Sequence, residues 1–339
     1  MSFKAAINRF RRKVMHSLTG NIGSQQDYVI PGLNPQKILV IRANHRLGNQ
    51  LLLSPLILEL EWIFPEAKVD LFVRGGASRA IYENYPTVNE IFTLPGKPFK
   101  ALLDYCGVWL KVASRRYDLV INATGGSSSG KLATKLAKSE SKIYGNTAID
   151  KLPLHMAQAP VQALRNAVDQ ANIPFQLRPI PGMNIRLSRT EIDAGAKKLH
   201  EIAASHQPVI ALFTYATGSK RYEDEYWAKV RQTLEKQFLQ YTLIEVLPVE
   251  NISAFGHTLP HFYSRDLREI AAVLYNCKIF IAADSGMMHL GEAAHVPTLG
   301  LFKVTSPEKY GPYGEGSSSI DTNRTTIDDL MTAVRAVLE

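Results

Sequence analysis

Short apolar runs alternate with longer segments of helical apolar spacing through the first half of the chain. Residues 38–41 form a run of four aliphatic side chains that follows Pro35 and precedes a loop containing Gly48. Such continuous runs are typical of parallel strands that are buried on both faces. Further strands are predicted at 69–73, 90–92 and 118–121. Helices are predicted between and after the strands, at 51–64, 78–85, 99–114 and 131–137.

The same alternation begins again after a proline-dense stretch at Pro174, Pro179 and Pro181. Strands are predicted at 209–213, 241–246, 278–282 and 298–302, and helices at 223–238 and 327–338. Two successive β/α series predict two doubly wound α/β domains that face each other. We place these domains at 36–182 and 183–325, followed by a C-terminal helix at 326–339. Because ligands of open α/β sheets bind beyond the carboxyl ends of the strands, the expected site is the cleft between the domains.

Length and composition agree with two globular domains. The chain has 339 residues, about twice a typical domain, and 45% of them are hydrophobic. That share of apolar residues excludes a disordered or low-complexity protein. The two cysteines, Cys106 and Cys277, form no CxxC pair. Neither a disulfide scaffold nor a cysteine-ligated zinc site is therefore expected.

The positive charge is concentrated at the N-terminus. The net charge is +8, but residues 1–26 contain five basic residues and no acidic one, which leaves 34 basic against 31 acidic residues, or +3, in the rest of the chain. Apolar residues recur in this arm at helical spacing: Phe3, Ile7, Phe10, Val14 and Leu18. The arm is therefore predicted to be a basic amphipathic helix. It either lies on an anionic membrane surface or packs by its apolar side on the globular body.

Other partners and locations are disfavoured. The body shows no basic patch with interleaved aromatic residues, so nucleic acid is not an expected partner. No apolar stretch has the length of a signal-peptide core or of a membrane-spanning helix. The expected location is cytoplasmic.

The most informative motif follows the strand at 278–282, where Asp284-Ser285-Gly286 leads into a helix that begins around Gly286 or Met287. Free backbone N–H groups and the positive end of the helix dipole make such a turn an anion site, especially for phosphate. His289, in the first turn of this helix, is expected to point at the same anion. The alternative is an ordinary capped helix with a surface histidine.

A second motif follows the strand at 209–213, where Thr217 and Gly218 precede the basic pair Lys220 and Arg221. A lysine and an arginine on such a loop can neutralise a diphosphate. The alternative is a solvated polar loop.

Two loops of the first domain carry weaker signals. The loop at 42–50 contains His45, Gly48 and Asn49 at the transition from strand to helix, but it is not a GxGxxG sequence and no acidic residue follows the second strand. A dinucleotide dehydrogenase is therefore disfavoured. The loop at 122–130 is either a site for sugar hydroxyls or phosphate, or a simple linker.

Together these motifs resemble the family 9 glycosyltransferases, the bacterial ADP-heptose:lipopolysaccharide heptosyltransferases and their relatives. The family's Gly-Asp, six residues before a proline, is matched by Gly48-Asn49 before Pro55, and its Lys-Arg element by Lys220-Arg221. Its strongest signature, Asp-Ser/Thr-Gly-x-x-His-Leu, is matched from Asp284 to Leu290. Further matches are Val296-Pro297, Phe302, Thr305 and Gly311-Pro312-Tyr313-Gly314. The resemblance covers roughly residues 36–330.

The resemblance implies a GT-B architecture of two Rossmann-like domains and a metal-independent, inverting transfer with no cofactor. The donor, a nucleotide-diphosphate sugar such as ADP-heptose, is held mainly by the C-terminal domain. An inner-membrane, lipid-linked saccharide acceptor approaches the N-terminal domain. By the same resemblance Lys220 and the Ser285-Gly286 turn hold the diphosphate, and Asp284 and His289 line that pocket. An acidic residue, Glu250 or Glu245, binds the nucleoside.

The sequence departs from the family pattern at the position of the expected general base. Asn49 replaces an aspartate, and an amide does not take up a proton from the acceptor hydroxyl. Either His45 in the same loop is the base, or a carboxylate reaches in from elsewhere, or the chain binds without catalysing. We favour an active enzyme that uses a heptose donor, with a hexose donor as the alternative. Lys303, in place of a family glycine, leaves the identity of the sugar open.

Overall fold

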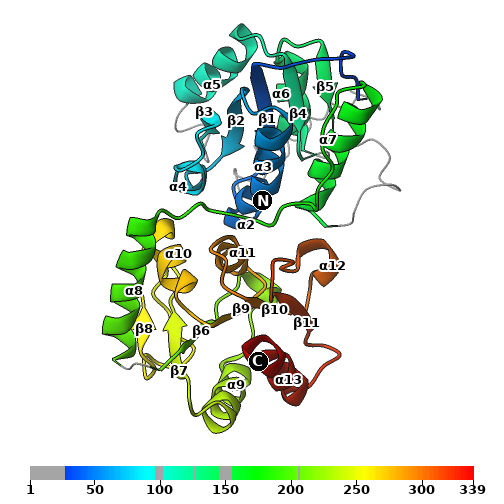
Figure 1. The fold of residues 1–339 in the computed structure, drawn as a ribbon. Coiled ribbons are helices and arrows are strands. Elements are labelled where there is room, and N and C mark those ends of the chain that lie inside the picture. Colours follow the sequence, from blue (N-terminus) through cyan, green and yellow to red (C-terminus); the bar gives the residue numbers. More distant parts are fainter. Residues whose placement is uncertain (1–26, 96–101, 125–126, 145–154, 205–206) are drawn as a thin grey trace.

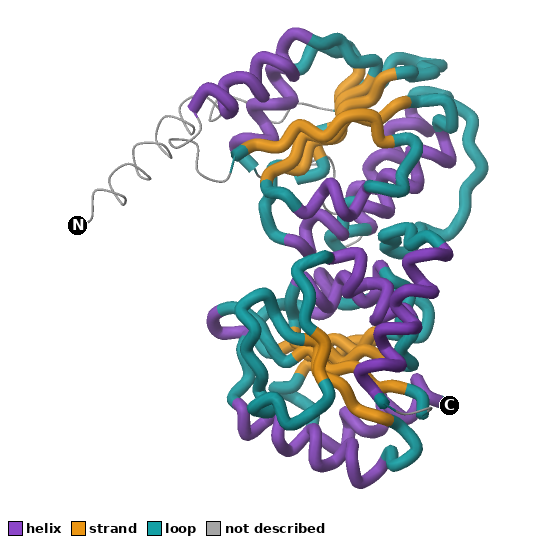
Figure 2. The backbone as a smooth tube through the Cα atoms, turned by 90° about the vertical axis from the view of Figure 1, so that its left-hand side faces the viewer, coloured by secondary structure: helices purple, strands orange, loops and turns teal. Residues whose placement is uncertain are grey.

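The structure is a computed structural model that describes residues 27–95, 102–124, 127–144, 155–204 and 207–339. The predicted arm at residues 1–26 lies outside these residues. Two α/β domains lie one above the other in Figure 1, and each contains one parallel sheet with helices on both faces, as the tube in Figure 2 also shows. None of the helices in the described ranges is long and apolar enough to cross a membrane.

The N-terminal sheet has the order β3-β2-β1-β4-β5, and all of its pairs are parallel. Its strands are β1 (Lys37–Arg42), β2 (Lys68–Arg74), β3 (Val88–Leu94), β4 (Leu119–Asn122) and β5 (Ser141–Ile143). Its helices are α2 (Leu47–Leu51), α3 (Ser54–Ile63), α4 (Ala77–Tyr82), α5 (Leu102–Ser114), α6 (Ser128–Leu136) and α7 (Gln158–Gln170).

The C-terminal sheet has the order β11-β10-β9-β6-β7-β8 and is also parallel. Its strands are β6 (Val209–Phe213), β7 (Thr242–Val246), β8 (His261–Phe262), β9 (Ile279–Ala283), β10 (Thr298–Phe302) and β11 (Ser318–Asp321). Its helices are α8 (Arg189–Ala203), the 3₁₀ helix η3 (Gly218–Lys220), α9 (Asp224–Gln237), α10 (Leu267–Tyr275), α11 (Gly286–Ala293), α12 (Pro307–Tyr310) and α13 (Ile327–Leu338). The two predicted β/α series are therefore confirmed.

The helix predicted at 51–64 is α3 (Ser54–Ile63), and a separate short helix, α2, precedes it over residues that were predicted as a loop; Pro55 near the start of α3 prevents one continuous helix. Proline has no N–H, so it cannot donate to the carbonyl of Leu51 as a helix interior requires. The hydroxyl of Ser54 donates to that carbonyl instead, at 2.8 Å, and α3 begins there. The break sets α2 apart as a short helix at the edge of the cleft.

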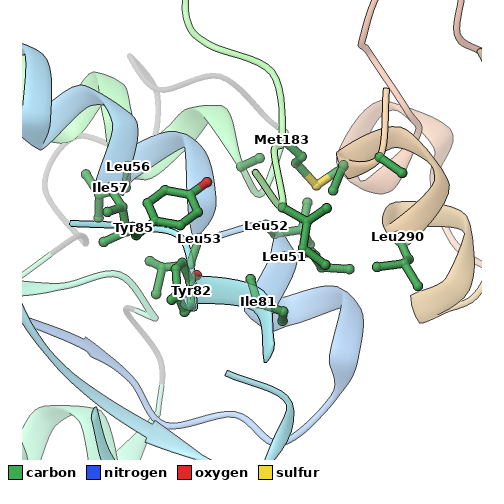
Figure 3. Packing of buried hydrophobic residues seen from close by; sticks show 14 of the residues in the cluster. Leu51, Leu52, Leu53, Leu56, Ile57, Ile81, Tyr82, Tyr85, Met183 and Leu290 are labelled. Atoms are coloured by element: carbon green, nitrogen blue, oxygen red, sulfur yellow. The ribbon is translucent and has the colours of Figure 1, made fainter. Parts of the chain in front are cut away.

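One apolar cluster joins the two domains. It covers one face of the N-terminal sheet through Ile38 and Val40, and it continues onto the C-terminal sheet through Ala211 and Phe280. Figure 3 shows Leu51 of α2 facing Leu290 of α11, with Met183 of the connecting segment beside them. The opposite faces of the two sheets carry separate clusters, with α5 and α6 on the N-terminal sheet and α9 and α13 on the C-terminal sheet.

Candidate active site

A cavity of about 1300 Å³ lies between the domains, beyond the carboxyl ends of strands from both sheets. Loops after β1 and β2 line it on one side, and loops after β6, β7, β9 and β10 line it on the other. Of the residues named from sequence, the cavity brings together His45, Asn49, Thr217, Lys220, Glu250, Asp284, Ser285, Gly286 and His289. Strand ends that are far apart in the sequence thus meet at one site, as expected for open α/β sheets.

The turn after β9 presents the start of α11 to this cavity. Ser285 has an extended backbone and caps the helix, since its Oγ accepts a hydrogen bond from the N–H of Met288 at 3.4 Å. Gly286 and Met287 line the cavity, and the first N–H groups of a helix have no partner within that helix. This end of α11 therefore offers backbone donors and a positive dipole to an anion.

Gly286 serves the contact between the domains as well as the anion site. A Cβ atom at this position would lie 2.9 Å from Cβ of Leu47 and 3.0 Å from the backbone nitrogen of Gly48. Gly48 is equally constrained, because a Cβ there would lie 2.6 Å from Cδ2 of His289. Two glycines, one on α2 and one on α11, thus let the helices that flank the cleft approach closely.

Lys220 stands at the start of α11 in an ion pair with Asp284. Its Nζ lies 2.7 Å from Oδ2 of Asp284, and the hydroxyl of Thr305 donates to the same carboxylate. Asp284 is buried, and Lys220 is about one-quarter exposed. The aspartate therefore holds the ammonium group against the cleft, where a diphosphate would meet both the lysine and the helix N-terminus.

Arg221 does not share this position. Its guanidinium lies over the ring of Tyr215, 5.5 Å from the centroid, and the residue is not part of the cleft lining. The 3₁₀ helix η3 ends at Lys220, and Arg221 follows it with an extended backbone. Of the basic pair, Lys220 alone reaches the cavity in this structure.

Lys303, the second departure from the family pattern, also points away from the cleft. Its ammonium group lies 4.9 Å from the ring centroid of Tyr222 and donates to the carbonyl of Arg221. Val304 and Thr305, the next two residues, line the cavity in its place. The lysine therefore contacts the loop that carries Lys220 and does not line the cavity.

His289 is buried, which contradicts the surface-histidine alternative. Its exposed fraction is 4%, and burial, reinforced by the charges of His155, Lys220 and Arg42, lowers its pKa to about 3. Its Nδ1 has no hydrogen-bond partner among the described atoms. The neutral ring therefore offers hydrogen bonds to a ligand in the cleft but supplies no positive charge.

Arg42, at the end of β1, determines what Asn49 presents to the cleft. The guanidinium is buried, and it donates from Nη2 to Oδ1 of Asn49 at 3.2 Å and from Nη1 to the carbonyl of Ala123 at 3.1 Å. Burial lowers the pKa of Arg42 to about 10. Because a guanidinium has only donors, the amide oxygen of Asn49 is the atom that faces Arg42, and its NH₂ group is not used in this bond and can donate to a ligand. Asn49 is thus a hydrogen-bond donor to the site.

His45 and Glu250 are exposed at the rim of the cavity. Glu245, the other acidic residue considered for the nucleoside, is buried outside it, where it accepts hydrogen bonds from the hydroxyl of Thr214 at 2.9 Å and from the N–H of Ala254 at 3.1 Å. Besides Asp284 and Glu250, the carboxylate of Asp266 also lines the cavity. It caps α10 by accepting a hydrogen bond from the N–H of Arg268 at 2.8 Å. Of the two glutamates, Glu250 is therefore the one that a nucleoside in the cleft can reach.

The loop at 122–130 does not line the cavity over its described residues. Asn122 accepts from the N–H and hydroxyl of Thr124, and Ser127 caps α6 by accepting from the N–H of Gly130 at 3.3 Å. These bonds make the described part of this loop a structural connection.

Within the ranges that the structure describes, no group of three or more His, Cys, Asp or Glu side chains is arranged to hold a metal ion.

Two parallel Rossmann-like domains that face a shared cleft define the GT-B class of glycosyltransferases. The sequence profile of glycosyltransferase family 9 (heptosyltransferase) matches residues 107–331. This match covers more than half of the chain, so the protein belongs to glycosyltransferase family 9 and is a glycosyltransferase. No curated protein sequence matches the chain.

Solved structures agree with this assignment at the level of the fold. A family 9 glycosyl transferase from Veillonella parvula superposes with a TM-score of 0.74 at 16% identity, over 91% of this chain and 99% of that one. The E. coli heptosyltransferase WaaC with ADP gives a TM-score of 0.70 at 16% identity, over 89% and 99%. E. coli ADP-heptose lps heptosyltransferase II gives 0.67 at 17% identity, over 89% and 98%.

Several positions at the site were not singled out from the sequence. Arg42 was included only as the first residue of the loop at 42–50, whereas in the structure it is the last residue of the buried strand β1. Arg265 and Asp266 line the cavity from the loop between β8 and α10, and they belong to none of the motifs identified in the sequence.

Proposed function

We propose that the protein transfers a heptose from ADP-heptose to a lipid-linked, lipopolysaccharide-core-like acceptor, with inversion and without a metal ion. The observation that carries this proposal is the Lys220–Asp284 pair, at 2.7 Å, beside the N-terminus of α11 in the cleft. A cation and free backbone donors at one point suit the diphosphate of such a donor. The fold likeness to E. coli heptosyltransferases, one of them solved with ADP, favours this nucleotide and sugar.

In this proposal the C-terminal domain holds the donor. The diphosphate lies against the N–H groups of Gly286 and Met287 and accepts from Lys220, with Thr217 beside it. Glu250, at the rim, accepts hydrogen bonds from hydroxyl groups of the nucleoside. As the glycosidic bond to the diphosphate breaks, the charge that develops on the leaving oxygen is stabilised by the same donors.

On the acceptor side we propose His45 as the general base. The acceptor oxygen forms its bond to the anomeric carbon while the hydroxyl proton passes to the imidazole of His45, and the diphosphate leaves. Asn49 accepts a hydrogen bond from Arg42 through its oxygen, so its NH₂ group is the part that donates to an oxygen of a substrate, and an amide is too weakly basic to take up the proton. His45 lies in the same loop and at the same cavity.

A transfer assay tests this proposal. Purified protein is incubated with ADP-heptose and a lipid-linked core acceptor that lacks heptose, with and without EDTA, and product is detected by mass spectrometry and NMR. We expect one added heptose of inverted anomeric configuration in both conditions. Loss of activity with EDTA would overturn the metal-independent part.

Two alternatives give different results in the same assay. Transfer from a UDP- or GDP-hexose, and none from ADP-heptose, would show a hexosyltransferase. Binding of nucleotide sugar without transfer to any acceptor would show a silent binding protein, the alternative raised by Asn49.

We further propose that the protein is peripheral at the cytoplasmic face of the inner membrane, held there by the basic arm at residues 1–26. The five basic residues and the apolar stripe of the arm support this. Deletion of residues 1–20 is expected to weaken binding to anionic vesicles and to leave ADP binding unchanged, as measured by vesicle sedimentation and calorimetry. Unchanged vesicle binding would mean that the arm packs on the body.

A further inference from the structure

Arg268 of α10 is buried at the boundary between the domains, and it makes five hydrogen bonds. Nε and Nη2 donate to the two carboxylate oxygens of Glu191 in α8, within the C-terminal domain. Nη1 donates to the carbonyl of Ala80 in α4 at 2.8 Å and to that of Ile185 at 3.1 Å, and Nη2 also donates to the carbonyl of Arg186 at 2.9 Å. A guanidinium has five N–H donors, so every donor of this side chain has a partner.

These partners tie three parts of the molecule to α10. Glu191 belongs to the C-terminal domain, Ala80 to the N-terminal domain, and residues 185–186 to the segment that connects the two. Figure 1 shows α4 above α10. Ala80 of α4 and Leu267 of α10 both line the cavity, whereas Arg268 does not, so Arg268 joins two walls of the cavity without facing it.

Helix α4 is bonded in turn to Gln50 of α2. The hydroxyl of Ser78 donates to Oε1 of Gln50 at 2.8 Å, and the hydroxyl of Tyr82 donates to the backbone carbonyl of Gln50 at 2.7 Å. Gln50 is buried, and its Nε2 donates to the carbonyl of Asn44. Gln50 thus fastens the loop at 42–50 to α4.

A chain of hydrogen bonds and helix backbone therefore runs from α10 in one domain to the loop at 42–50 in the other. In the proposed reaction this loop supplies His45, while the diphosphate lies on the C-terminal domain, so transfer depends on how the two domains are held. A displacement of the reacting groups by about 1 Å can cost about 100-fold in rate.

We propose that Arg268 is a positioning residue for the transfer reaction, and that it acts through α4 and Gln50 to hold the loop at 42–50 in place across the cleft. Since Arg268 does not line the cavity, its loss changes the position of the loop and leaves the donor contacts of Lys220 and α11 intact. The effect on catalysis rests on the proposed function, whereas the coupling between α10 and the loop is a property of the fold.

Amide hydrogen exchange of the full chain, measured by mass spectrometry, tests the coupling without a substrate. Arg268→Met removes all five donors, and we expect the amides at 43–50, in the other domain, to exchange about tenfold faster, as expected for loss of a hydrogen bond from a charged donor. The control is Arg231→Met on α9, whose guanidinium also makes hydrogen bonds, to Glu235 at 2.8 Å and to Thr258 at 2.6 Å. It should leave exchange at 43–50 as in the wild type.

Two further variants test the steps of this chain of contacts. Ser78→Ala combined with Tyr82→Phe removes the side-chain bonds from α4 to Gln50 and leaves Arg268 unchanged, so it should speed exchange at 43–50 in the same way. Added to Arg268→Met, it should have little further effect, because both changes interrupt one chain of contacts. Arg268→Lys keeps a positive charge with fewer donors, and its exchange should lie between that of Arg268→Met and that of the wild type.

Kinetics and binding separate positioning from a general loss of structure. In the transfer assay Arg268→Met is expected to lower kcat by about 10–100-fold, while its ADP affinity, measured by calorimetry, stays at the wild-type value. Arg268→Lys should recover part of kcat. An equal loss of ADP affinity and of kcat would mean a structural role alone and would overturn the proposal.

The exchange data carry two more outcomes that would overturn it. One is wild-type exchange at 43–50 in folded Arg268→Met, and the other is full additivity of Arg268→Met with the Ser78→Ala/Tyr82→Phe pair. If Arg268→Met does not fold, Arg268→Lys and the Ser78→Ala/Tyr82→Phe pair decide by the same measurement, and wild-type exchange in both would overturn the proposal. Faster exchange in Arg268→Met together with no transfer by the wild type would contradict the proposed function and not the coupling.

Discussion

At the scale of single residues, the site depends on which way a few polar side chains are held. Arg42 is buried with two hydrogen-bond acceptors, and one of them is the side chain of Asn49. Asp284 holds Lys220 toward the cleft, whereas Arg221 lies on Tyr215. The chemistry of the pocket therefore follows from these contacts as much as from the residue types.

Asn49→Leu is expected to lower the free energy of unfolding by about 1–3 kcal/mol, because it leaves the buried guanidinium of Arg42 with one fewer acceptor. Asn49→Asp keeps an acceptor and adds a charge opposite Arg42, so it should be at least as stable as the wild type. Urea denaturation at neutral pH measures both. Equal free energies of unfolding for Asn49→Leu and the wild type would show that the Arg42–Asn49 hydrogen bond does not stabilise the fold.

His45→Ala is expected to lower kcat for transfer by about 10²–10⁴-fold, because general base catalysis is typically worth that much. Asn49→Ala should have a smaller effect on kcat, since it removes a hydrogen-bond donor and no base. His257→Ala, at an exposed histidine outside the cavity lining, is the control. Near wild-type turnover of His45→Ala would exclude this residue as the base.

At the scale of elements, the buried strands are the part of the fold that the sequence predicts best. Strands such as β1, β6 and β9 are almost entirely buried, and they read as continuous apolar runs. The edge strands β5, β8 and β11 were missed because they are short and contain polar residues such as Ser141, His261 and Ser318. Helix α2 was missed because its residues were assigned to the polar loop at 42–50 that precedes the predicted helix.

The shared location of the motifs that follow strands was predictable from the topology of a parallel sheet. The carboxyl ends of parallel strands converge on one edge of a sheet, so the sequence predicts that Lys220 and Asp284 share one site, and the structure places them in contact. Side-chain direction within a tight turn cannot be read from residue order, and the position of Arg221 shows this.

Helix α11 also carries an ionisable group that no substrate contact explains. Oε1 of Glu292 accepts hydrogen bonds from the N–H groups of Tyr313 at 2.9 Å and Gly314 at 2.8 Å, and Oε2 has no partner among the described atoms. Burial raises the pKa of Glu292 to about 7. Glu292 therefore ties the loop at 311–314 to α11 and is protonated more readily than an exposed glutamate.

This shift predicts how Glu292→Gln changes stability with pH. Between pH 4.5 and 7 the folded protein keeps the proton that the unfolded chain releases, so wild-type stability falls as pH rises through this window. Glutamine does not titrate. The free energy of unfolding of Glu292→Gln relative to the wild type should therefore increase by about 3 kcal/mol across the window. Urea denaturation at several pH values measures it, and parallel pH profiles for the two proteins would contradict this prediction.

At the scale of the whole molecule, the cleft is held by contacts at both of its sides. Arg268 of α10 donates to the carbonyl of Ala80 in α4 at 2.8 Å, which joins the C-terminal domain to the N-terminal domain. On another side the hydroxyl of Tyr313 donates to the carbonyl of Pro181 in the connecting segment at 2.9 Å. With the apolar contact between Leu51 and Leu290 (Figure 3), these bonds keep the loop after β1 facing the loops after β6 and β9.

We propose above that this cleft binds a nucleotide-diphosphate sugar through Lys220 and the start of α11. The most direct test is calorimetric titration of the full chain with ADP, UDP and GDP, for the wild type, Lys220→Met and the control Lys236→Met on α9. We predict that ADP binds most tightly, that Lys220→Met weakens ADP binding by about 10–100-fold, as expected for loss of a charge-assisted hydrogen bond, and that the control has no effect. No measurable affinity for any of the three nucleotides, or wild-type ADP affinity in Lys220→Met, would contradict the claim.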